Sequence, residues 1–190
     1  VILAAELVSI KGGAVPQRKL LPLQKFIEAP NVSYGYVNAE LGVDGIARLF
    51  PRAVVLDEEM MIPFSREIAN RLGVPELPQS DYEISFVGPA GSFHTISAGD
   101  VIAGRVPRER FLEKIVLVGA TASNLHDIVS VPLPENLMTG VEWHANVLDN
   151  ILLARPILNT NPIIVYTAGA VIGFFLLIVS LFANTPRVLG

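Results

Sequence analysis

The chain has 190 residues, of which 51% are hydrophobic and 17% are charged, and its net charge at pH 7 is −4. Soluble domains average roughly 25% charged residues, so part of this chain is expected to contact lipid or another protein. The negative charge provides no attraction for nucleic-acid phosphates, so we expect no nucleic-acid partner. The lack of cysteine excludes disulfides, thiolate zinc sites and a cysteine nucleophile.

The first half of the chain predicts strands and short helices. Residues 1–8 form an apolar run typical of a buried strand, and residues 20–29 carry apolar side chains at helical spacing. Residues 32–39 alternate as a half-buried strand does, and a glycine-containing turn leads from them to residues 46–50. We expect these two segments to pair as an antiparallel hairpin. A short helix is expected at residues 65–72, where a glycine and a proline follow.

The second half begins with a short apolar strand, expected at residues 83–87. Short helical pieces are expected at residues 100–103 and 108–112. After Lys114, residues 115–118 are a continuous apolar run that ends at Gly119. Such a run is typical of a parallel strand that is covered on both faces, so we expect it to be a buried strand.

A longer helix is expected at residues 141–154, where apolar positions recur at helical spacing. We expect one apolar stripe to be buried and the polar positions to face water. The stripe comprises Val141, Ala145, Leu148 and Leu152, and the polar positions are Glu142, Asn146 and Asp149. Strands that alternate with helices predict an α/β domain over residues 1–158, a mixed sheet with helices packed on it.

Residues 163–183 form an almost unbroken apolar run of 21 residues without a charged side chain, and they predict one transmembrane helix at residues 162–183. At 1.5 Å per residue this run is about 32 Å long, which matches a hydrocarbon core of roughly 30 Å. Gly169 and Gly173 stand four residues apart and form a candidate contact for another membrane helix. Ordinary glycines in a lipid-facing helix are the alternative. Residues 184–190 are expected to form a short tail.

Several blocks between residues 85 and 153 resemble the CHASE2 family. They are FVGPAGSF at residues 86–93, SAGDV at 97–101, GRVP at 104–107, KIVLVGATA at 114–122, GVEWHAN at 140–146 and LDN at 148–150. The likeness is looser upstream. The resemblance therefore implies the C-terminal part of a CHASE2 domain, followed by the first membrane helix after it, with the N-terminal part of the domain preceding residue 1.

CHASE2 domains are extracytoplasmic sensory domains attached to bacterial cyclases and kinases. The resemblance implies a membrane-anchored, ligand-responsive domain on the periplasmic side of the bacterial inner membrane, with no catalysis and no cofactor. The expected partners are membrane lipid, other transmembrane helices or a membrane protein, and a cytoplasmic cyclase or kinase output module on the full polypeptide. A second hypothesis is a structural accessory subunit of a larger membrane complex that keeps the fold.

Two glycine turns follow predicted strands, and such turns can bind phosphate where their backbone N–H groups point at it. Neither turn carries the lysine and hydroxyl of a P-loop or the three-glycine dinucleotide fingerprint, so we favour a purely conformational role. The candidates for ligand binding, if there is a ligand at these turns or beside them, are Gly88, Gly91, Gly119, Thr121, Asp127 and His144.

Catalytic and metal-binding chemistry is not favoured by the remaining residues. The spacing of His94, His126 and His144 matches no metal motif, so we predict no metal site. For His144 we favour a histidine at the edge of the core, hydrogen-bonded to a loop. A third hypothesis is an enzyme that uses Ser92 beside His94, but no Gly-x-Ser-x-Gly elbow surrounds this serine, so we predict no catalytic residue.

The composition of the first predicted strand indicates that other segments must pack around it. Residues 1–7 are apolar on both faces apart from Glu6, so a strand there needs neighbours on each side and cover above and below. The other predicted strands do not complete both sides. We therefore expect either an N-terminal segment of the same polypeptide or a partner protein to pack against this part of the sheet.

Overall fold

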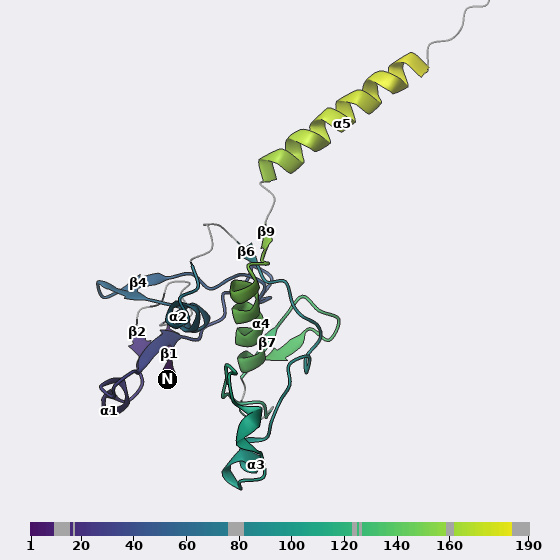
Figure 1. The fold of residues 1–190 in the computed structure, drawn as a ribbon. Helices are drawn as coiled ribbons and strands as arrows, with labels where there is room; N and C mark the ends of the chain where they lie inside the picture. The colour runs from purple at the N-terminus through teal and green to yellow at the C-terminus, as the bar shows by residue number, and fades with distance from the viewer. Residues whose placement is uncertain are drawn as a thin grey trace, which may run out of the picture. The chain divides into compact units, whose positions relative to one another are not determined.

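The structure is a computed structural model that describes residues 1–9, 16, 18–75, 82–122, 125, 127–158 and 162–183. The chain divides into two compact units, Val1–Ile157 and Leu158–Gly190. The first unit holds small sheets and packed helices, and the second contains one long apolar helix (Figure 1). This arrangement confirms the predicted fold class.

The central sheet has three strands in the order β2-β1-β3. β1 (Ile2–Val8) pairs in parallel with β3 (Ser33–Tyr36) and antiparallel with β2 (Arg18–Leu20), so the sheet is mixed, as expected. β1 lies where the sequence places the first strand. Its apolar side chains have neighbouring strands on both sides, although β2 covers only its second half, from Glu6 to Val8.

The expected hairpin between residues 32–39 and 46–50 is wrong. β3 pairs with β1 instead, because β1 offers it a longer apolar strand edge. Residues 46–50 lie elsewhere: Leu49 forms an antiparallel bridge with Glu83, and the N–H of Ala47 donates to the carbonyl of Ser130 at 2.7 Å. This segment therefore connects the two halves of the unit rather than completing a local hairpin.

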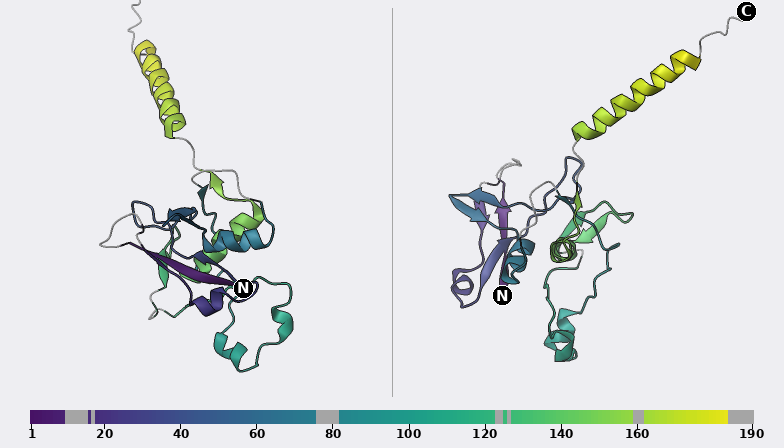
Figure 2. Two further views of the ribbon diagram at one scale, coloured as in Figure 1. Left: turned by 90° about the vertical axis from the view of Figure 1, so that its left-hand side faces the viewer. Right: turned by 45° about the horizontal axis from the view of Figure 1, so that its top comes forward.

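Helix α2 (Phe64–Arg71) contacts β1, β3 and helix α4 (Gly140–Leu153), and Figure 2 shows α2 between the sheet and α4. Gly35 permits this packing. A Cβ added at Gly35 would lie 2.6 Å from Cα of Phe64 and 2.9 Å from its backbone nitrogen. The first turn of α2 thus rests directly on the backbone of β3.

The remaining elements are short. The hairpin of β4 (Val54–Leu56) and β5 (Glu59–Met61) and the hairpin of β7 (Ile128–Ser130) and β8 (Leu137–Thr139) were not predicted. The others are α1 (Gln24–Ile27), β6 (Tyr82–Glu83), α3 (Ala98–Ile102), a 3-10 turn at Arg108–Arg110 and β9 (Ile157–Leu158), which pairs with β6.

Two hydrophobic clusters form the core. The larger one joins α4, through Trp143, Val147 and Ile151, to Ile68 and Ala69 of α2 and to side chains of the surrounding loops. The smaller one comprises Ala5 and Leu7 of β1, Tyr36 of β3 and Met61 of β5. Because α4 contributes the largest buried side chain, Trp143, it is the centre of the first unit.

The segment 114–118 is not the buried strand that its sequence predicts. It belongs to none of the sheets of the described residues and is drawn as coil between α3 and β7 in Figure 1. Val118 is 88% exposed and Val116 is 51% exposed, whereas Leu117 is half-buried against the larger cluster. The sequence pattern was strand-like, but within the described residues no neighbouring strand pairs with it.

The second unit contains helix α5 (Pro162–Ala183). Residues Ile163–Leu181 are long and apolar enough to cross a membrane, and none of this span is buried within the structure. A Cβ added at Gly169 or Gly173 would meet nothing within 4 Å, so both positions leave open space on the helix surface.

We predict that Gly35→Ala destabilises the first unit by about 2–3 kcal/mol, because the new methyl group would overlap the backbone of Phe64, which cannot rotate away. Urea unfolding of the chain in mild detergent measures the effect. Gly99→Ala is the matched control: its Cβ would meet its nearest neighbour, the Ser97 hydroxyl, at 3.5 Å. Equal stability of the two variants would contradict the close approach of α2 to β3.

Candidate functional site

Helix α4 holds the loops of the first unit by hydrogen bonds from its side chains. Trp143 is 1% exposed, and its indole Nε1–H donates to the carbonyl of Ala47 at 3.1 Å. Indole N–H groups need a partner when they are buried. This bond therefore secures the segment that connects to Ser130 and Glu83.

His144 lies beside Trp143 and is also buried, at 6% exposure. Its Nε2 lies 3.1 Å from the carbonyl oxygen of Val37, and its Nδ1 lies 3.1 Å from the hydroxyl of Ser65. Because a carbonyl can only accept, Nε2 is assigned the proton and Nδ1 is assigned as the acceptor. Burial lowers the pKa of His144 from 6.5 to about 4, and the bond to Val37 opposes this shift. His144 thus links α4 to α2 and to the chain after β3 as a neutral imidazole.

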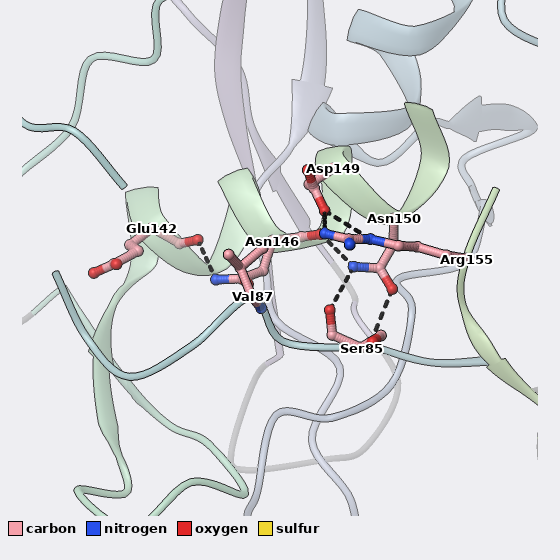
Figure 3. Close-up of polar contacts among 7 residues, drawn as sticks. All are labelled: Ser85, Val87, Glu142, Asn146, Asp149, Asn150 and Arg155. Carbon is pink, nitrogen blue, oxygen red and sulfur yellow. Dashed lines mark hydrogen bonds and ion pairs between the residues drawn. The ribbon is translucent and has the colours of Figure 1, made fainter. Parts of the chain in front are cut away.

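A second row of side chains on α4 binds the segment after β6 (Figure 3). Oδ1 of Asn150 accepts from the N–H of Ser85 at 2.8 Å, and its Nδ2 donates to the carbonyl of Ser85 at 2.9 Å. Asn146 accepts from the N–H of Val87 at 2.9 Å. The carboxylate of Glu142 accepts from the N–H of Gly91 at 2.8 and 3.0 Å to its two oxygens.

The spacing of this row follows from the geometry of the two elements. Positions 142, 146 and 150 are four residues apart, so they lie on one helix face and advance about 6 Å per step. An extended chain advances about 6.6 Å every two residues. The amides of Ser85 and Val87 therefore meet successive asparagines, and α4 serves the extended segment as a neighbouring strand would.

The predicted orientation of α4 is wrong in part. Asn146, expected to face water, is 1% exposed, and Asn150 is fully buried, whereas Leu152, expected to be buried, is 38% exposed. The reason is that the polar face of α4 is covered by the loop 84–91, whose backbone groups the two asparagines satisfy. The repeat of Glu142, Asn146 and Asn150 at intervals of four was the signal in the sequence that could have indicated such a row.

Three of the candidate ligand-binding residues lie at the first turn of α4. The carboxylate of Asp127 lies against Gly140, where an added Cβ would be 2.1 Å from its Oδ1. A Cβ added at Gly119 would lie 2.5 Å from Cβ of Val141. Gly91 has a φ of +88° and donates to Glu142. A carboxylate thus already occupies the start of α4, where the helix dipole favours negative charge.

Of the other candidates, Gly88 is near this group, and Thr121 and His144 are not. Gly88 lies in the same turn as Gly91, and a Cβ there would be 2.5 Å from the hydroxyl of Ser92. Thr121 is exposed, and His144 lies in the core, separate from the first turn of α4. The structure therefore brings together Gly91, Gly119 and Asp127 but not the full set of six.

The described residues contain no group of three or more metal-ligating side chains, and His126 lies outside the described residues. The hydroxyl of Ser92 donates to the carbonyl of Pro89 at 2.7 Å, while the ring of His94 contacts the guanidinium of Arg110. Ser92 and His94 thus bond to different partners, which is not the arrangement of an activated nucleophile.

Comparison with protein families identifies a match to the CHASE2 domain over residues 3–183. The chain belongs to the CHASE2 family. CHASE2 is a family of extracytoplasmic sensory domains in signalling proteins, and it is not a catalytic family. Searches of curated proteins and of solved structures found no match. The row on α4 falls within the GVEWHAN and LDN blocks that resemble the family, so these blocks carry the interactions that assemble the domain.

We predict that Asn150→Leu destabilises the first unit by about 2–3 kcal/mol, because it removes both bonds to the part-buried N–H and C=O of Ser85. Amide hydrogen exchange at residues 84–87 is expected to accelerate. Asn70→Leu is the control, since Asn70 is exposed and its side-chain oxygen accepts from the exposed guanidinium of Arg66. Unchanged exchange in the Asn150 variant would show that α4 does not hold this segment.

The lowered pKa of His144 predicts a pH-dependent stability. Between pH 6.5 and about pH 4 the unfolded state binds the proton and the folded state does not, so stability decreases as the pH falls through this window. The full effect is about 3 kcal/mol. Urea unfolding at pH 7, 5.5 and 4.5 measures it. His144→Gln should reduce this slope, while His94→Gln, which removes an exposed histidine, should retain it.

Proposed function

We propose that this chain is the ligand-responsive sensory domain of a bacterial signalling protein, anchored in the inner membrane by α5 with its first unit on the periplasmic side. The observation that carries the proposal is the CHASE2 match, which extends over both the α/β unit and the apolar helix. Signalling would then pass from the folded unit to a cytoplasmic cyclase or kinase module of the full polypeptide.

The contacts of α4 support a path for such a signal. One face of α4 binds the backbone of residues 85–91, and the other face binds Ala47, Val37 and Ser65. Ala154, in the left-handed conformation, ends the helix, and only residues 155–161 separate it from α5 in the sequence. A ligand that alters the 88–91 turn would alter the bond from Gly91 to Glu142 and so act on the helix that leads into the membrane segment.

The open surface at Gly169 and Gly173 supports a contact with another membrane helix, because small residues let helix backbones approach closely. Lipid would cover the rest of α5. A structural accessory subunit of a membrane complex is the second candidate, and the exposed apolar side chains of the first unit, such as Val116 and Val118, favour it as surfaces for a partner.

The proposed topology is testable because the chain contains no cysteine. In the natural polypeptide, Val43→Cys, at a fully exposed position, is expected to react with a membrane-impermeant maleimide in cells whose outer membrane is permeabilised. Gly190→Cys, beyond α5, is expected to react only after lysis. Labelling of the Val43→Cys variant only after lysis would place the first unit in the cytoplasm and refute the proposal.

Purification in mild detergent then separates the two candidates. A signalling protein is expected to migrate without a fixed partner, and its cyclase or kinase activity should belong to the same polypeptide. A separate membrane protein that copurifies in constant stoichiometry, together with no output module on the polypeptide, would support the accessory subunit instead.

A further inference from the structure

Residues 92–113 form an excursion of the first unit, which contains α3 and the 3-10 turn and extends away from α4 (Figure 1). Two side-chain contacts join its first part to its last part. Nε and Nη2 of Arg105 donate to Oδ1 of Asp100 at 2.9 and 2.5 Å. Nη2 of Arg110 contacts Nε2 of His94. These contacts hold the two parts of the excursion together.

A hollow of about 390 Å³ lies between these two parts, and residues of both parts line it. Its charged side chains are two guanidinium groups, of Arg105 and Arg110, and one carboxylate, of Asp100. With histidine neutral, the hollow therefore carries one net positive charge. The whole chain has a net charge of −4, so this positive site is a local property of the excursion and not of the protein surface in general.

Arg110 supplies the uncompensated charge. Asp100 neutralises Arg105, whereas Arg110 forms no ion pair with the described residues. A guanidinium group can only donate, so Nε2 of His94 is assigned as the acceptor of their contact. This contact orients Arg110 without cancelling its charge. The remaining N–H groups of Arg110 form the fork that binds a carboxylate through two parallel hydrogen bonds.

The hollow also offers a hydroxyl and an apolar wall. Ser97 precedes α3, where serine usually caps a helix, but its side chain makes no capping bond. Among the described residues its hydroxyl has no hydrogen-bond partner, so it can donate to a ligand. Ile96 and Val106 are half-buried and line the same hollow. A few polar groups beside an apolar wall are the usual composition of a small-molecule site.

We propose that this hollow binds a small organic carboxylate, with its carboxylate on Arg110 and Ser97 and a short apolar body against Ile96 and Val106. The single positive charge matches a monoanion. A phosphate group carries roughly 1.5 to 2 negative charges at pH 7, and inorganic phosphate has no apolar part for this wall. The inference rests on the proposed sensory function and deepens it, because it names the class of ligand and the place where it binds.

The position of the excursion connects this site to α4. The excursion begins one residue after Gly91, whose N–H donates to the carboxylate of Glu142. A ligand that draws the two parts of the excursion together thus acts on the turn that α4 holds. Binding at the hollow is thereby coupled to the helix that precedes the membrane segment in the sequence.

Amide hydrogen exchange of the natural polypeptide in a non-ionic detergent tests the proposal. The probe is sodium butanoate, with the ionic strength kept constant by sodium chloride. Exchange at residues 92–113 is expected to slow at least about threefold at saturation, and the midpoint concentration gives the apparent affinity. Butylammonium, of equal length and opposite charge, is expected to have no effect. Slowing by both probes or by neither would overturn the proposal, as would inorganic phosphate with a lower midpoint than butanoate.

Two arginine variants provide a matched pair. Arg110→Gln and Arg108→Gln remove the same charge from the same 3-10 turn, but only Arg110 lines the hollow. The butanoate midpoint is expected to rise at least about tenfold in Arg110→Gln and less than about twofold in Arg108→Gln. Equal midpoints in the two variants would overturn the proposal. Ser97→Ala, which removes only a hydroxyl, is expected to raise the midpoint about threefold. Unchanged exchange within α4 shows that each variant is folded.

The topology experiment with Val43→Cys separates this inference from the proposed function. Binding of butanoate that depends on Arg110, together with a cytoplasmic first unit, would support this site and refute the proposed function. A periplasmic first unit without such binding would refute the site and leave the proposed function standing.

Discussion

The structure of the first unit depends on hydrogen bonds from α4 to the backbones of its loops. The sheets are small, so many backbone groups near the core have no strand partner, and a buried N–H or C=O without a partner is costly. Trp143, His144, Asn146 and Asn150 satisfy these groups from two faces of one helix. Because these backbone groups are hydrogen-bonded, the loops can pack against the apolar side chains around Trp143.

The contacts of α4 also explain the positions of two acidic side chains that could otherwise bind a ligand. Glu142 holds Gly91, and Asp127 lies against Gly140. Polar side chains that could receive a ligand are thus already engaged in holding the domain together. A ligand that acts near the first turn of α4 would have to alter these contacts, and a sensory domain needs a contact whose change can be transmitted.

The first unit contains a buried polar residue, neutral His144, and an exposed apolar segment, residues 114–118. His144 is enclosed on all sides, and its pKa is lowered because water is excluded from it. Val116 and Val118 are apolar and face solvent. Surface ion pairs such as Arg105 with Asp100 add little to stability. The stability of the domain therefore depends mainly on the hydrophobic core around α4.

The sequence alone determined the features that depend on local pattern. Continuous apolar runs located β1 and the apolar helix α5, helical patterns located α2 and α4, and the ordered motif blocks indicated the family. It could not determine strand pairing, because alternation shows which residues suit a strand but not which edge lies beside it, so residues 46–50 were assigned to the wrong partner. Nor could it determine that Asn146 and Asn150 are buried. An asparagine is stable in a core only where another segment presents backbone groups at the right spacing, and residues 85–87 reach that position only through the tertiary fold.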